Sequence, residues 1–137
     1  MVSGVRERPC SLQLMLEAEL TSTVIGAAIE VRKHLGCGLL ESAYHAFLCI
    51  ELSKRGLTFK SQPLLPIVYD GHRVEAAYRP DLIIGDSLIV ELKAVEVVLP
   101  VHSAQVLTYM RITGLRKGLL FNFNVPVLKE GIKSFVM

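Results

Sequence analysis

Apolar residues recur along the chain with two different spacings, and these spacings separate predicted helices from predicted strands. Over residues 11–35 the apolar positions recur every three or four residues, which is the period of an amphipathic helix. The same spacing predicts helices over residues 39–55 and 101–113. A glycine follows each of the three segments, where it can cap the end of a helix.

The segments between the second and third helices, and after the third, have the composition of β-strands. Asp70-Gly71 between two apolar runs is a strong β-hairpin signal. The chain up to Lys93 therefore predicts a sheet of three or four antiparallel strands, and the order of elements predicts an α+β sandwich with helices covering a mixed sheet. Outside the central hairpin described next, the predicted strands are residues 57–61, 64–69, 72–77, 118–124 and 132–136.

The central hairpin carries charged residues within strands that are otherwise apolar. Its turn is residues 85–87, and Asp81 and Glu91 stand equally far from the centre of that turn. In an unbulged antiparallel register the two carboxylates face each other on one side of the sheet, and Lys93 shares that side. Opposed like charges destabilise the pair unless a cation lies between them. The hairpin therefore predicts a metal site, and a structural cluster of ion pairs is the alternative.

Length and hydropathy narrow the class of protein. The 137 residues are expected to form one domain over residues 11–137, preceded by a flexible lead-in of residues 1–10. A hydrophobic content of 51% and a mean hydropathy of +0.44 indicate a tightly packed core and allow a buried homodimer interface. No apolar run approaches the roughly 18 residues of a membrane span, so no membrane association is expected.

Cysteine content and charge complete this picture. The N-terminal residues are polar and basic without an apolar segment, so no secretory signal is expected. The three cysteines are too scattered for a disulfide framework or a zinc site, which favours a reducing, cytoplasmic location. A net charge of +2 permits nucleic-acid binding but does not by itself indicate it.

Two motifs in the chain resemble those of a nuclease superfamily. Pro80-Asp81 followed by Glu91-Leu92-Lys93 is similar to the pattern Pro-Asp, spacer, Glu-x-Lys of the PD-(D/E)XK nuclease superfamily. Gly38, Glu41 and Tyr44 match Gly-x-x-Glu-x-x-Tyr, the signature of the small GxxExxY protein family in the same superfamily. The resemblance extends over about residues 20 to 137 and implies a restriction-endonuclease-like core, a mixed and mostly antiparallel sheet flanked by helices. One departure is Cys37, where a proline would be expected.

The resemblance also implies an active site. Asp81 and Glu91 are the expected ligands of Mg²⁺, with Mn²⁺ as an alternative ion, because hard cations prefer carboxylate oxygens and water. The resemblance brings Glu41 to the same site, as a ligand bound directly or through water. Lys93 would orient the attacking water or stabilise charge on the phosphate, and Gln105 resembles the helix glutamine that holds the water or a phosphate.

The expected activity is hydrolysis of phosphodiester bonds in nucleic acid, with DNA the expected partner. The alternative is a catalytically silent protein with the nuclease fold, acting as a dimeric interaction module or a nucleic-acid-binding module. His102 and Tyr109 are weaker site candidates on the face of the third helix that carries Gln105. Tyr44 is expected in the core with its hydroxyl tethered. His34, His45 and His72 are assigned no role.

Overall fold

The structure is a computed structural model that describes residues 10–137, without the side chains of residues 10, 11, 76 and 77. The predicted lead-in of residues 1–10 lies outside the described residues, except for Cys10, where the first helix begins. No helix within residues 10–137 is both long enough and apolar enough to cross a membrane.

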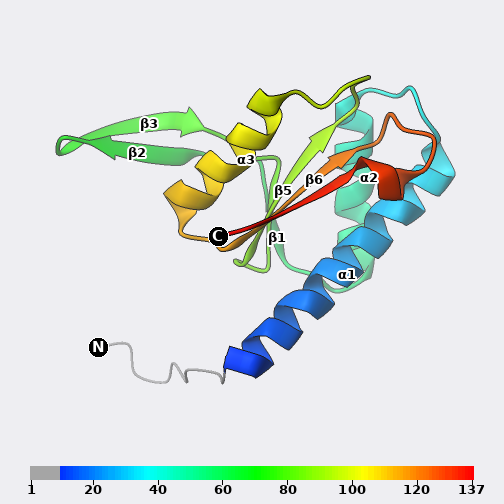
Figure 1. The fold of residues 1–137 in the computed structure, drawn as a ribbon, viewed down its shortest axis with the longest axis horizontal. Helices are drawn as coiled ribbons and strands as arrows, with labels where there is room; N and C mark the ends of the chain where they lie inside the picture. Colours follow the sequence, from blue (N-terminus) through cyan, green and yellow to red (C-terminus); the bar gives the residue numbers. More distant parts are fainter. Residues whose placement is uncertain (1–9) are drawn as a thin grey trace.

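Three α-helices form close to where the apolar spacing predicts them. They are α1 (Cys10–Leu35), α2 (Glu41–Lys54) and α3 (Pro100–Thr113). The turn between α1 and α2 uses Gly36 and Gly38 at φ values of 70° and 83°, a conformation that glycine adopts without steric cost. That turn brings α2 back alongside α1, so the two helices pack together (Figure 1).

A five-stranded sheet forms the centre of the fold, in the order β1-β4-β5-β6-β7. All neighbouring strands are antiparallel except β5 and β6, which are parallel and joined through α3. This α+β architecture confirms the predicted fold class, a mixed and mostly antiparallel sheet flanked by helices. The strands are β1 (Phe59–Ser61), β4 (Leu82–Ile84), β5 (Leu88–Lys93), β6 (Lys117–Asn122) and β7 (Ile132–Val136), and a short 3-10 helix η1 (Leu128–Gly131) precedes β7.

The hairpin predicted around Asp70-Gly71 forms, but it does not join the central sheet. Its strands β2 (Leu65–Tyr69) and β3 (His72–Tyr78) make a separate two-stranded sheet that projects from the body of the molecule (Figure 1). By Lys93 the central sheet therefore contains three antiparallel strands, β1, β4 and β5.

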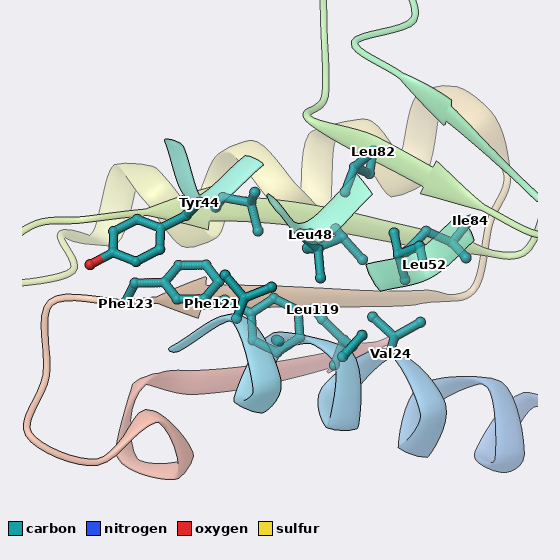
Figure 2. Packing of buried hydrophobic residues seen from close by; sticks show 14 of the residues in the cluster. Val24, Tyr44, Leu48, Leu52, Leu82, Ile84, Leu119, Phe121 and Phe123 are labelled. Carbon is teal, nitrogen blue, oxygen red and sulfur yellow. The ribbon is translucent and has the colours of Figure 1, made fainter. Parts of the chain in front are cut away.

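Apolar side chains cover both faces of the central sheet, which explains why β4 and β5 are apolar almost throughout. Alternate residues such as Leu82, Ile84 and Phe121 pack against α1 and α2 (Figure 2). Tyr44 of α2 stacks on Phe123 in this layer, with ring centroids 4.4 Å apart. The residues of opposite parity, Ile83, Ile89 and Leu120, pack against Val106, Tyr109 and Met110 of α3.

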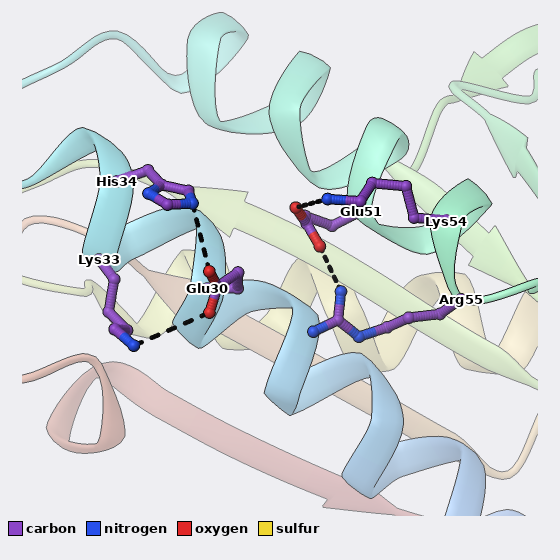
Figure 3. Close-up of polar contacts among 6 residues, drawn as sticks. All are labelled: Glu30, Lys33, His34, Glu51, Lys54 and Arg55. Carbon is purple, nitrogen blue, oxygen red and sulfur yellow. Dashed lines mark hydrogen bonds and ion pairs between the residues drawn. The ribbon is translucent and has the colours of Figure 1, made fainter.

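Ion pairs link residues three or four positions apart on α1 and on α2. Around Glu30 of α1, where Lys33 and His34 are exposed, each pair is worth about 0.3–0.5 kcal/mol. On α2 the central acid, Glu51, is buried. Figure 3 shows Glu30 with Lys33 at 4.0 Å and His34 at 3.2 Å, and Glu51 with Lys54 at 3.2 Å and Arg55.

Candidate active site

The register of the β4–β5 hairpin places Asp81 and Glu91 opposite each other. Leu82 pairs with Val90 and Ile84 with Leu88, so the next pair toward the open end of the hairpin is Asp81 with Glu91. This register is the one predicted from the centre of the turn. Because side chains alternate along a strand, both carboxylates belong to the side of the sheet that α3 covers.

Each carboxylate accepts a hydrogen bond from the backbone of the other strand. The N–H of Asp81 donates to Glu91 Oε1 at 2.7 Å, and the N–H of Leu92 donates to Asp81 Oδ2 at 2.7 Å. These bonds use one oxygen of each carboxylate and leave the second oxygen, Asp81 Oδ1 or Glu91 Oε2, for another partner. The two acids are therefore held together by the backbone despite their like charges.

Glu91 is an unusual acid because its environment opposes ionisation. Only 4% of the residue is exposed. Burial, and then the neighbouring Asp81 carboxylate, raise the pKa of Glu91 to about 8, although the Asp81 N–H and Lys93 act in the opposite direction. A cation at the free carboxylate oxygens would take the place of the proton.

Glu41 reaches the same end of the hairpin from the first turn of α2. Its Oε1 accepts a hydrogen bond from the N–H of Ala94 at 3.3 Å, so it too keeps one oxygen free. The Gly-x-x-Glu-x-x-Tyr motif explains this placement. Gly38 turns the chain into α2, and Tyr44 anchors the start of the helix because its buried hydroxyl donates to Gly36 O at 2.5 Å. Tyr44 is a core residue with a tethered hydroxyl, as predicted.

Lys93 and Tyr109 of α3 also lie close to the two carboxylates. Lys93 Nζ lies 4.0 Å from Glu91 Oε2, and its side chain is only 16% exposed. Burial and the charges of Glu91 and Asp81 raise the pKa of Tyr109 to about 12. The Tyr109 hydroxyl donates to Arg79 O at 3.4 Å. Tyr109 is therefore a neutral hydrogen-bond donor beside the two acids.

The two other candidates on α3 are less closely associated with the acids. Gln105 is half-buried one turn before Tyr109, and its side chain makes no hydrogen bond with any of the described carboxylates. The Nδ1 atom of His102 accepts a hydrogen bond from the N–H of Leu99 at 3.0 Å, which caps the helix. His102 is thus a helix-start residue, and its ring nitrogen is used within α3.

The structure adds His45 to the site, a residue to which the sequence assigned no role. His45 and Glu41 are four residues apart on α2, a spacing that puts both on one face of the helix and could have indicated the link. His45 Nε2 lies 3.2 Å from Asp81 O and 3.3 Å from Ser61 Oγ. Because a carbonyl oxygen only accepts, the bond to Asp81 requires the proton on Nε2.

A pocket of about 420 Å³ opens beside the carboxylates, between the start of α2 and the end of β1. Its lining includes Gln62, which the sequence did not single out and whose backbone conformation no local signal predicts. The other lining residues are Glu41, Ser42, His45, Asp81 and Leu92.

Asn122 is a third residue to which the sequence assigned no role. It is buried at the end of β6, where its Nδ2 donates to Val95 O at 2.9 Å and its Oδ1 accepts from the N–H of Val95 at 3.1 Å. Asn122 and Glu41 together fix residues 94–95, directly after Lys93. A lone amide in the apolar run of residues 118–123 was the available signal, because a buried polar group needs specific partners.

The donor chemistry of this site fits a hard divalent cation. Glu41, Asp81 and Glu91 each use one oxygen on a backbone N–H and retain one, and Mg²⁺ characteristically takes one or two carboxylates with several waters. Within the described residues, no three His, Cys, Asp or Glu side chains are arranged so that all could hold one ion.

Comparison with known proteins gives a clear family match. Residues 18–135 match the model of a family described as the PD-(D/E)XK nuclease superfamily. The crystal structure of SSO0001 is 20% identical, with a TM-score of 0.49, over 97% of this chain and 69% of that chain. That similarity is too distant to indicate a function. No curated protein matches the sequence.

Proposed function

Because the chain belongs to the PD-(D/E)XK nuclease superfamily, we propose that it is a Mg²⁺-dependent nuclease that hydrolyses phosphodiester bonds of nucleic acid, with DNA the expected substrate. Nucleases of this superfamily generally use divalent metal ions. Within it we assign the chain to the GxxExxY family, on the signature of Gly38, Glu41 and Tyr44.

One observation carries the proposal: Asp81 and Glu91 are fixed by each other's strand and still keep one oxygen each for a cation. When bound, a divalent cation supplies charge neutralisation for the phosphate and activation of a water molecule. Asp81 and Glu91 would hold it directly, and Glu41 would hold it through water. Backbone anchoring means that little reorganisation is needed when the ion binds.

The remaining groups act on water and phosphate. Lys93, whose Nζ lies 4.0 Å from Glu91 Oε2, orients the attacking water or stabilises the negative charge that develops on the phosphate. Gln105 of α3 would supply a hydrogen bond to the water or to a phosphate oxygen. Mn²⁺ is the alternative ion because it accepts the same oxygen ligands.

A test compares two aspartates of the same hairpin. Asp81→Asn retains an oxygen for the Leu92 N–H but removes the charge, so we expect cleavage of plasmid and single-stranded DNA with Mg²⁺ to fall at least about 100-fold. Asp86→Asn changes an exposed residue of the turn, which pairs with Lys60 at 3.5 Å, and should cleave like the wild type. Full activity in Asp81→Asn would exclude this mechanism.

Exposed apolar residues favour a second candidate, a catalytically silent module that forms a homodimer or binds nucleic acid. Leu14 and Met15 near the start of α1 are 58% and 68% exposed, and Leu14 lines an apolar groove of about 450 Å³ beside Val136. Calorimetric titration with Mg²⁺ and Mn²⁺ separates the candidates. Folded protein that binds neither ion at millimolar concentration would favour the silent module.

A further inference from the structure

Gln62 has a left-handed backbone conformation although it lies in a bend outside the two hairpin turns. Among the described residues, only Gln62, Asp70 and Asp86 have a left-handed conformation without being glycine, at φ values of 49°, 50° and 51°. The two aspartates lie in hairpin turns, where this conformation is common for aspartate. Gln62 lies at the exit of β1 before Pro63, which restricts its backbone further. Such a conformation costs about 1 kcal/mol or more and is characteristic of functional sites.

Gln62 lies at the acidic site. Its N–H donates to Asp81 O at 2.9 Å, and the same carbonyl lies 3.2 Å from His45 Nε2. Gln62 lines the pocket of about 420 Å³ together with Glu41, His45 and Asp81. The Gln62 carboxamide makes no hydrogen bond with any described residue, so both its donor and its acceptor are available to a ligand.

The pocket is large enough to hold more than a hydrated ion. A cation with about four waters, at roughly 30 Å³ per water, would fill roughly a third of it. The whole volume falls in the range of about 300–1,000 Å³ that is typical of organic ligands. Space therefore remains beside the carboxylates for an organic part of the substrate.

The residues that line the pocket indicate which part of the substrate it could hold. It contains carboxylates, a hydroxyl, an imidazole and an amide, but neither lysine nor arginine among the described residues. A phosphate away from the cation would be repelled by Glu41 and Asp81. An uncharged group with several hydrogen-bonding edges suits these donors and acceptors.

We propose that this pocket holds the nucleoside next to the scissile phosphate, and that Gln62 binds the edge of its base. The assignment rests on the proposed nuclease function. A glutamine carboxamide offers one donor group and one acceptor, the arrangement with which it pairs in a bidentate manner with a base edge. Gln62 is then a specificity-determining residue, and the strain of its backbone is the cost of aiming its side chain.

The experiment compares Gln62→Gly with Asp70→Gly. Both variants relieve the backbone strain of a left-handed residue. Only Gln62→Gly removes a side chain from the pocket, because Asp70 lies in the β2–β3 turn. Binding is measured by fluorescence anisotropy with Mg²⁺ and labelled phosphorothioate oligonucleotides, which resist cleavage. We expect Gln62→Gly to melt at the same or a higher temperature and to bind about tenfold more weakly. Asp70→Gly should melt similarly and bind like the wild type.

A series of oligonucleotides with one abasic position tests whether the contact is to a base. At one position the wild type should lose affinity and Gln62→Gly should lose no more, because the contact is already absent. Gln62→Asn, which tolerates the left-handed conformation with a shorter side chain, serves as a second variant.

Three results would overturn the assignment: wild-type protein that binds no oligonucleotide, Gln62 variants that bind like the wild type, or losses that add at every abasic position. The protein could also show non-additive losses from the Gln62 variant and the abasic site at one position, yet leave ordinary phosphodiester oligonucleotides intact. That result would support the pocket and refute the nuclease function. The two proposals therefore fail in distinguishable ways.

Discussion

Glu91 accepts a hydrogen bond from the backbone N–H of Asp81 at 2.7 Å, so the backbone holds the two acids together while their charges repel. The strands cannot separate the charges without breaking this bond and its counterpart from Leu92 to Asp81. A proton or a cation is the remaining way to relieve the repulsion.

The stability of the metal-free protein should fall with rising pH. Burial and Asp81 raise the pKa of Glu91 from 4.5 to about 8. Between these values the folded protein binds one proton more than the unfolded chain, so the free energy of unfolding decreases, on the order of a few kcal/mol in total. Urea unfolding in EDTA from pH 5 to pH 9 measures this. Glu91→Gln should lack this decrease, and parallel profiles for the two proteins would contradict the assignment.

Binding of a divalent cation should release a proton. Near pH 7 Glu91 is mostly protonated without metal, and a cation that takes its free oxygen displaces that proton. Calorimetric titration in two buffers with different ionisation enthalpies should give about one proton per ion. Glu91→Gln should bind more weakly and release none. An enthalpy that does not depend on the buffer would refute displacement at Glu91.

Lys93 should contribute to hydrolysis much more than to metal binding. Lys93→Met removes the ammonium 4.0 Å from Glu91 and should lower the cleavage rate by about 10²- to 10⁴-fold, with Mg²⁺ still bound. Lys60→Met is a matched control, since Lys60 is an exposed lysine paired with Asp86. Equal rates in the two variants would remove Lys93 from the mechanism.

Removing the charge of Glu41 should weaken the binding of Mg²⁺. In Glu41→Gln the amide oxygen can still accept from the Ala94 N–H, so the fold is retained while one negative charge is lost. We expect affinity for Mg²⁺ to fall about tenfold. Glu30→Gln, a change in an exposed ion pair of α1, provides the comparison. An unchanged affinity would place Glu41 outside the metal site.

Gly131 should be essential for stability, unlike Gly26. A Cβ at Gly131 would lie 2.2 Å from the carbonyl oxygen of Asn122, and backbone cannot easily move away. Gly131→Ala should therefore lower the free energy of unfolding by about 2 kcal/mol or more. Gly26 lies inside α1 with nothing within 4 Å of its Cβ position, so Gly26→Ala should raise it by about 0.5–1 kcal/mol. Urea unfolding of both variants tests the contrast.

Local patterns in the sequence predicted much of the fold and the Asp81–Glu91 pair of the candidate site. The spacing of apolar residues located all three helices, because each helix buries one face. The central turn predicted the Asp81–Glu91 register, because residues equally far from the turn pair across a hairpin and alternate residues of a strand share one face. Both inferences depend only on residues close together in the sequence.

Relationships between distant residues could not be derived in this way. The β2–β3 hairpin has the alternation and turn of a sheet strand pair, yet its separation from the central sheet depends on which edges are free after the rest has packed. Glu41 meets Ala94 across 53 positions, and only the family resemblance linked that glutamate to the hairpin. His45 and Gln62 reach the site through backbone contacts with Asp81, which no residue pattern records.

The chain leaves the body of the protein at Gln62 and returns at Asp81, and these two residues are joined by a hydrogen bond of 2.9 Å. The segment between them, which contains the β2–β3 hairpin, is therefore a loop whose two ends are held together. Its length is not fixed by the central sheet. Lengthening such a loop costs little, since closure entropy grows only with the logarithm of loop length. An insertion at the Asp70-Gly71 tip, the end of this hairpin that projects from the body (Figure 1), should therefore leave the central sheet and the acids at the hairpin's base intact.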